Sequence, residues 1–159
     1  SPLFVFFATI SSHMPFVPTP PYQENWSRIL SSKPYDEHIL NLDSGPSLNP
    51  KTARLAYEKA IDYELRLLAG FLKKTAFQEP VIIVLGDHQP PALVSGRDSS
   101  WLVPVHVFAR DDATIEPFFQ AGFTRGFEPT GMALGRLNGL HELILEGFDS
   151  SWQAQADEK

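Results

Sequence analysis

An aspartate and a histidine stand side by side, one glycine after a run of five aliphatic residues. This run, residues 81–85, reads VIIVL, and Gly86 separates it from Asp87 and His88. A carboxylate is a hard anionic ligand and a neutral imidazole is a borderline nitrogen donor, so the pair could bind a divalent cation. Gly86 permits a backbone bend that would aim both side chains at one point. The alternative is a Gly-Asp turn capped by His88, since two ligands alone are too few to define a metal site.

A second histidine, His13, follows another apolar run, PLFVFFATI at residues 2–10. Histidine titrates near neutral pH, so His13 could bind an anionic substrate, ligate a metal or act as a general acid. The alternative is a loop histidine held by backbone carbonyl groups. The neighbouring Ser11 and Ser12 would need an oriented base to become nucleophiles, and we interpret them as turn residues.

Short apolar segments and one amphipathic segment would position these residues. Residues 2–10 and 81–85 are short, continuous and apolar, which predicts buried strands, and a third strand is predicted from Val103. The helical period of apolar residues from Asn49 to Lys74 predicts a long helix packed on the sheet. Alternation of strand and helix predicts an α/β fold with a mainly parallel sheet and right-handed crossovers.

The predicted sheet would gather the candidate residues at one edge. In open α/β sheets, ligands bind outside the carboxyl ends of the strands. Asp87 and His88 leave the second strand at that end, and His13 leaves the first strand there if the two are parallel. The sequence therefore predicts that two histidines and a carboxylate converge. His106, within the third strand, is interpreted as a satisfied core or edge histidine.

The composition sets limits on the class of protein. With 159 residues, 43% of them hydrophobic and twelve of them phenylalanine, the chain can bury a sizeable core. Its formal charge of −6 argues against a nucleic-acid surface, and the absence of cysteine excludes a thiol nucleophile. No apolar run reaches the roughly 20 residues that cross a bilayer. Shorter helices are predicted at residues 114–123 and 130–148, followed by a polar tail at 150–159 that we expect to fray.

Four segments occur in an order that resembles the sulfatase branch of the alkaline phosphatase superfamily. They read PLFVFFATISSHMPF, YEKAIDYELRLLAGFLKK, EPVIIVLGDHQPP and VPVHVFAR, and together they span roughly residues 2–110. The closest likeness is to bacterial membrane-anchored sulfatase-like proteins, which include lipoteichoic acid synthases and phosphoethanolamine transferases. The GDH after an aliphatic strand is the most specific part of this resemblance.

The resemblance implies a three-layer α/β/α sandwich, alkaline phosphatase-like, and roles for three residues. Asp87 and His88 stand where the family has the Asp-His pair that ligates the catalytic metal, here one divalent ion (Mn, Mg, Ca or Zn). His13 stands where the lipoteichoic acid synthase type has a histidine near the bound phosphate group. Two-metal members carry an aspartate four residues before that histidine, where this chain has Thr9, which favours a single metal.

The resemblance also implies that the catalytic nucleophile is not in this chain. In the family, a Thr, Ser or modified Cys nucleophile and another acidic ligand precede the first strand, and no segment here matches either. Residues 1–149 are therefore expected to be the C-terminal portion of a sulfatase-like catalytic domain, inactive when isolated. The parent would be an inner-membrane protein acting on phosphate or sulfate esters in a periplasmic or cell-surface domain.

The partners follow from the same expectation. The substrate ester could belong to a lipid headgroup or a glycan, whereas nucleic acid is not expected. The alternative function is a catalytically inactive sulfatase-like domain that binds an anionic headgroup, a glycan or a protein partner. An exposed sheet edge would also allow a homodimer.

Overall fold

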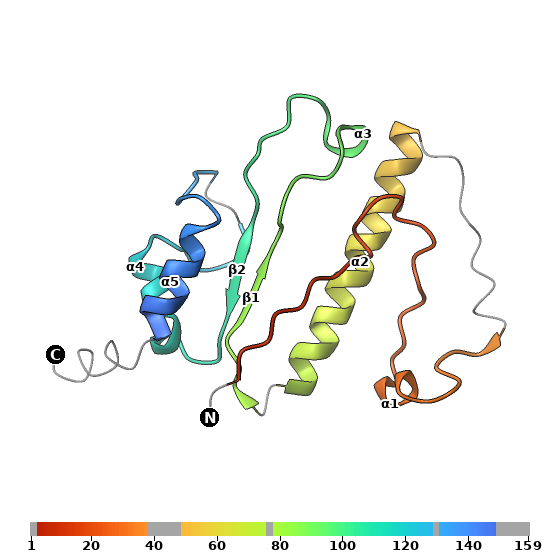
Figure 1. The fold of residues 1–159 in the computed structure, drawn as a ribbon, viewed down its shortest axis with the longest axis horizontal. Coiled ribbons are helices and arrows are strands. Elements are labelled where there is room, and N and C mark those ends of the chain that lie inside the picture. The colour runs from red at the N-terminus through yellow and green to blue at the C-terminus, as the bar shows by residue number, and fades with distance from the viewer. Residues whose placement is uncertain (1–2, 38–48, 76–77, 129–130, 149–159) are drawn as a thin grey trace. The chain divides into compact units, whose positions relative to one another are not determined.

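The computed structural model describes residues 3–37, 49–75, 78–128 and 131–148 (Figure 1). The chain divides into two compact units. The first comprises Ser1–Phe77 and Gln89–Ser100, and the second comprises Gln78–His88 and Trp101–Lys159. The predicted tail at residues 150–159 lies outside the described residues. A single domain over residues 1–149 stays a prediction.

The first unit is built on the long helix α2, Pro50–Thr75. The predicted start is confirmed, because Oδ1 of Asn49 accepts hydrogen bonds from the backbone N–H groups of Lys51 and Thr52 at 3.0 and 3.1 Å. This side-chain cap satisfies donors that have no partner within the helix. Small buried residues mark one face of α2, namely Ala53, Ala56 and Ala60.

A small apolar cluster packs on that face of α2. Phe16 is 2% exposed and contacts Ala56 and Ala60, with its ring edge-on to Tyr57 at a centroid distance of 5.3 Å. The short helix α3, Ala92–Ser95, packs against α2 as well, and Nε of Arg54 donates to the carbonyl of Val94 at 3.0 Å. Alanine at the contact positions lets the backbones approach closely. A one-turn helix, α1, spans Trp26–Ile29.

The buried strand predicted at residues 2–10 does not form. Residues 3–10 adopt no regular secondary structure and run as an extended chain (Figure 1). Their large apolar side chains are 70–86% exposed. A strand needs a partner for its backbone groups and a covering layer for its side chains, and within the first unit residues 3–10 have neither.

The second unit contains the two strands predicted in its part of the chain, β1 at Ile82–Leu85 and β2 at Val105–Phe108. They pair antiparallel, with Ile82 opposite Phe108 and Leu85 opposite Val105. The only helix in the residues that join them is α3, a single turn, whereas the crossover between parallel strands is usually a longer α-helix. Within the described residues this pair is the whole sheet, so the mainly parallel three-layer sandwich stays a prediction.

Short helices pack together in the remainder of the second unit. The 3-10 turn η3, Ala113–Ile115, leads into α4, Glu116–Gln120, and α5 spans Gly139–Phe148. Phe118 is 1% exposed, and its ring contacts those of Phe123 and Phe148. Helix α5 begins later than predicted, since residues 131–138 are not helical. Glycine at positions 131 and 135 is consistent with this difference, because glycine disfavours helix.

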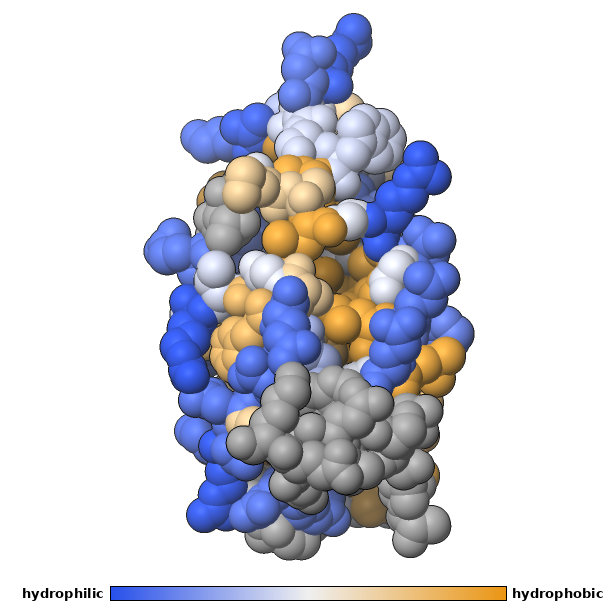
Figure 2. All heavy atoms as spheres, turned by 90° about the vertical axis from the view of Figure 1, so that its left-hand side faces the viewer, coloured by the Kyte–Doolittle hydropathy of each residue, from blue (hydrophilic) through white to orange (hydrophobic). Residues whose placement is uncertain are grey.

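Much of the apolar content of the described residues is at the surface. The buried hydrophobic residues among them are Phe16, Ala53, Ala56, Ala60, Ile115 and Phe118. Figure 2 shows apolar side chains exposed among polar ones on the face of the molecule turned to the viewer. The exposed apolar side chains of the second unit include Met132, Leu134, Leu145 and Trp101. The sizeable core predicted from composition is therefore not assembled within these residues.

Candidate functional site

The strand β1 places Asp87 and His88 at its carboxyl end. The pairing of β1 with β2 continues one residue beyond the two strands, because the backbone N–H of Gly86 donates to the carbonyl of Pro104 at 3.2 Å. Gly86 does not use the left-handed region that favours glycine. A Cβ atom built there would lie 3.6 Å from Cβ of Val103, which is ordinary contact. A residue with a Cβ atom would therefore also fit at position 86, so the bend that Gly86 permits does not require glycine on steric grounds.

The side chains of Asp87 and His88 turn toward each other. Oδ2 of Asp87 lies 3.5 Å from Nε2 of His88, and the side chains are 85% and 62% exposed, respectively. Oδ1 of Asp87 accepts the backbone N–H of His88 at 2.9 Å. The second contact is local and uses the backbone of His88, not its ring, so the alternative of a Gly-Asp turn capped by His88 stays open. With Oδ1 on the backbone N–H, Oδ2 is the oxygen that lies near the imidazole.

The donor set of this pair fits part of a divalent-cation site. A carboxylate oxygen and an imidazole nitrogen suit zinc or manganese, and both are at the surface where a hydrated ion can reach them. A protein site for such an ion uses three or more ligands. Within the residues that the structure describes, no group of three or more His, Cys, Asp or Glu side chains is placed to hold a metal. Asp87 and His88 could therefore supply two ligands of such a site.

His13 belongs to a tight turn in the first unit. Its backbone N–H donates to the carbonyl of Ile10, and its own carbonyl accepts the N–H of Phe16, both at 3.0 Å. Nδ1 of its ring donates to the carbonyl of Met14 at 2.8 Å. The expectation of a loop histidine held by backbone carbonyl groups is thereby confirmed. With the proton on Nδ1, Nε2 of the neutral ring carries a lone pair that can accept a hydrogen bond or ligate a metal.

The structure assigns His13 to the first unit and the Asp87–His88 pair to the second. Their convergence stays a prediction. His106 lies in β2 with its ring 5.8 Å from that of Phe127, which matches the expected packed strand histidine.

Glu64 on α2 holds the turn that carries His13, a contact that no sequence pattern predicts. Its Oε1 accepts the backbone N–H of Ser12 at 3.0 Å across 52 residues. Nothing in the local pattern separates Glu64 from the other charged residues of α2. Together with burial, which is the larger cause, Glu64 raises the pKa of Tyr57. Burial is also the main reason that the pKa of Tyr63 is raised, with Tyr35, Glu64 and Tyr22 adding to it.

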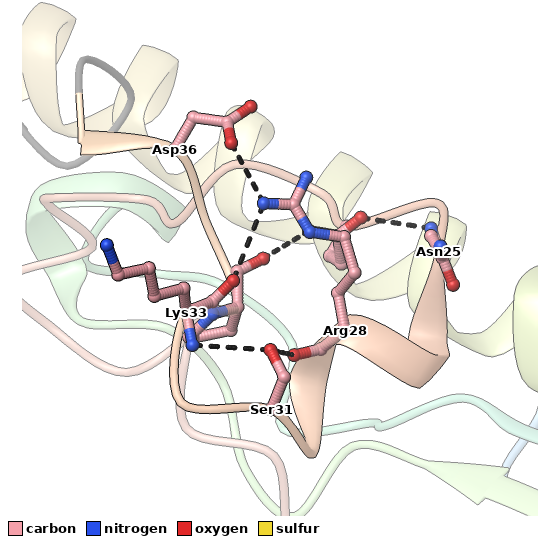
Figure 3. Close-up of polar contacts among 7 residues, drawn as sticks. Asn25, Arg28, Ser31, Lys33 and Asp36 are labelled. Carbon is pink, nitrogen blue, oxygen red and sulfur yellow. Dashed lines mark hydrogen bonds and ion pairs between the residues drawn. The ribbon is translucent and has the colours of Figure 1, made fainter.

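A second polar cluster orders the loop after α1 (Figure 3). Nη2 of Arg28 contacts Oδ1 of Asp36 at 2.8 Å and the carbonyl of Lys33 at 3.4 Å. Oγ of Ser31 donates to the carbonyl of Arg28 at 2.7 Å. Arg28, Lys33 and Asp36 border an open hollow of about 540 Å³. Because the cation of Arg28 is matched by Asp36, the contacts account for the loop conformation rather than for an anion site.

None of the helices within the described part of the chain combines the length and apolar character needed to span a membrane. Comparisons with protein-family models, with curated proteins and with solved structures found no match to this chain. The resemblance to sulfatase-like proteins therefore depends on the segments and residues quoted above.

Proposed function

We propose that this chain is the C-terminal portion of a metal-dependent hydrolase or transferase acting on phosphate or sulfate esters, with Asp87 and His88 as two of the metal ligands. The observation that supports this is the approach of Oδ2 of Asp87 to Nε2 of His88 at the exposed end of β1. Neighbouring residues on a straight strand would point to opposite faces. The parent protein and its extracytoplasmic location, like the sandwich fold, are proposed on the sequence resemblance.

Each residue of the proposed site has a distinct task. A bound divalent cation would offset the charge of the transferring phosphoryl or sulfuryl group and lower the pKa of the nucleophile. Asp87 supplies the anionic oxygen ligand, and the Oδ1 contact to the backbone N–H of His88 fixes the orientation of its carboxylate. His88 binds as a neutral imidazole, so protonation of His88 competes with the metal.

His13 is proposed to contact the substrate anion. Its ring is oriented by the Nδ1 hydrogen bond to Met14, which directs Nε2 away from that carbonyl. Nε2 donates a hydrogen bond to a nonbridging oxygen when the ring is an imidazolium, and the charge of that ring also offsets the anion. The nucleophile is proposed to come from outside this chain, so the chain alone turns over no substrate.

Titration with Mn²⁺, followed by electron paramagnetic resonance, tests the metal assignment. We expect weak binding by the chain, and a loss of about tenfold or more in affinity in Asp87→Ala and in His88→Ala. His141→Ala is the matched control, because His141 is an exposed histidine on α5 of the same unit. Equal binding by His88→Ala and the unmodified chain would place the metal elsewhere and remove the proposal's main support.

A second titration, with inorganic phosphate, separates the enzyme from the alternative function. Phosphate binding that requires Mn²⁺ supports the metal-dependent enzyme. Phosphate binding that is equally strong in the presence of a chelator contradicts it and supports a catalytically inactive domain that binds an anionic group.

A further inference from the structure

Asn138 stands directly before Gly139, the first residue of α5, and this is the single Asn-Gly pair among the four asparagines of the chain. In such a pair the backbone nitrogen of the glycine can reach the side-chain amide of the asparagine with little obstruction, because glycine has no Cβ atom. Among the described residues, the side chain of Asn138 makes no hydrogen bond that would hold its amide away from the backbone. The chemistry of this pair is local and involves only two adjacent residues.

The backbone of the turn before α5 delays any reaction of this pair. The N–H of Gly139 donates to the carbonyl of Arg136 at 2.9 Å, and the N–H of His141 donates to the carbonyl of Asn138 at 3.2 Å. The nitrogen of Gly139 can therefore attack only after it leaves the first of these bonds. The ends of helices open locally at low cost in free energy, and the neighbouring glycines at 131 and 135 raise the entropic cost of ordering the segment.

We propose that Asn138 is a site of spontaneous deamidation in the folded chain. In the opened turn, the deprotonated backbone nitrogen of Gly139 attacks Cγ of Asn138. The N–Cγ bond forms and the Cγ–Nδ2 bond breaks, and Nδ2 leaves as ammonia, taking up a proton in place of the one that the backbone nitrogen lost. Water then opens the cyclic imide. Attack of water at Cγ gives aspartate, and attack at the main-chain carbonyl carbon gives isoaspartate.

The two products differ in their effect on α5. Aspartate keeps the normal backbone and places a carboxylate at the N-terminus of the helix, where the unpaired N–H groups and the helix dipole stabilise a negative charge. Isoaspartate adds a methylene group to the main chain, which displaces the carbonyl that accepts the N–H of His141. Since α5 packs on α4, with the ring centroids of Phe118 and Phe148 6.2 Å apart, isoaspartate should loosen this packing. This inference does not rest on the proposed function.

Peptide mass spectrometry of the folded chain, incubated at neutral and at mildly alkaline pH, measures the conversion at each asparagine. We expect conversion at Asn138 that becomes faster as pH rises, because the attacking nitrogen must lose its proton. Asn49 is the control within the chain, since the following Pro50 has no N–H to lose. The proposal is overturned if Asn138 stays intact in the folded chain while it converts in urea, or if the rate of conversion does not depend on pH.

Gly139→Ala tests the attacking group. A Cβ atom at position 139 meets nothing within 4 Å, so α5 should be retained while the added methyl group hinders the attack. We expect conversion to slow several-fold, and an unchanged rate would contradict the route through Gly139.

Asn138→Ser tests the consequence for α5, because serine also caps helices but carries no amide. After equal incubation, the unmodified chain should unfold at a lower temperature than when fresh, whereas Asn138→Ser should not. An equal decrease in both would contradict the effect of isoaspartate on α5.

Discussion

The backbone N–H of Ser12 donates a hydrogen bond to Oε1 of Glu64 at 3.0 Å, which ties the turn that carries His13 to the long helix α2. The contact is partly buried and involves a carboxylate, so it is stronger than a neutral surface hydrogen bond. It makes α2 the support on which the orientation of His13 depends.

Removing this acceptor should destabilise the first unit. We expect Glu64→Ala to lower the free energy of unfolding by about 1–2 kcal/mol, since the Ser12 N–H loses its partner. Glu64→Gln keeps an oxygen acceptor and should cost less. Urea denaturation followed by circular dichroism measures both. If the two variants are equally destabilised, the packing of the Glu64 side chain matters rather than its hydrogen bond.

Alkaline pH should destabilise the first unit through two partly buried tyrosines. The pKa values of Tyr57 and Tyr63 are raised above the ordinary tyrosine value of 10.0, chiefly by partial burial. A group with a raised pKa in the folded state contributes stability that is present below its unfolded pKa and is lost as pH rises through its folded pKa. We therefore expect the free energy of unfolding to fall as pH rises above 10.0. Denaturation curves across this pH range, with Tyr57→Phe as the comparison, measure the effect. If the free energy of unfolding of Tyr57→Phe falls with pH as steeply as that of the unmodified chain, the contribution of Tyr57 is contradicted.

Glycine at position 70 is expected to be required for packing. A Cβ atom there would lie 2.2 Å from the hydroxyl of Tyr22 and 3.0 Å from Cζ2 of Trp26. The hydroxyl also accepts a hydrogen bond from Nε1 of Trp26 at 3.2 Å, so moving it breaks that contact. We expect Gly70→Ala to lower the free energy of unfolding by about 1–3 kcal/mol, although alanine favours helix.

The matched control for Gly70 is Gly139, the first residue of α5. A Cβ atom there meets nothing within 4 Å. Gly139→Ala should change the free energy of unfolding by less than about 1 kcal/mol, in the stabilising direction. Thermal denaturation of the two variants gives the comparison, and equal losses would rule out the clash at position 70 as the cause.

The sequence predicts features whose causes lie close together in the chain. The helix α2 was predicted from its apolar period, which repeats within a few residues. The strands β1 and β2 were located by their short aliphatic runs. Their antiparallel direction was not predicted, because it depends on the path of the residues that connect the two strands. No local pattern encodes that path.

Burial was predicted least well for the same reason. LFVFFATI at residues 3–10 has the composition of a core strand, yet burial depends on a partner that composition does not name. The candidate site follows the same division. Asp87 and His88 are neighbours, so their approach is local, whereas the convergence of His13 depends on contacts between distant segments. The hydrogen bond between Ser12 and Glu64 joins residues 52 positions apart, so no local pattern predicts it.

A substitution of Gly86 tests whether the approach of the Asp87 and His88 side chains requires glycine at that position. The sequence indicated only that Gly86 permits a backbone bend, and a Cβ atom at position 86 would meet Val103 and Pro104 only at 3.6–3.8 Å. We therefore expect Gly86→Ala to fold and to raise the free energy of unfolding by about 0.5 kcal/mol, because alanine restricts the unfolded chain. Its Mn²⁺ titration should match that of the unmodified chain. If Gly86→Ala keeps its circular dichroism spectrum but loses Mn²⁺ binding, metal binding requires a backbone conformation at position 86 that only glycine reaches.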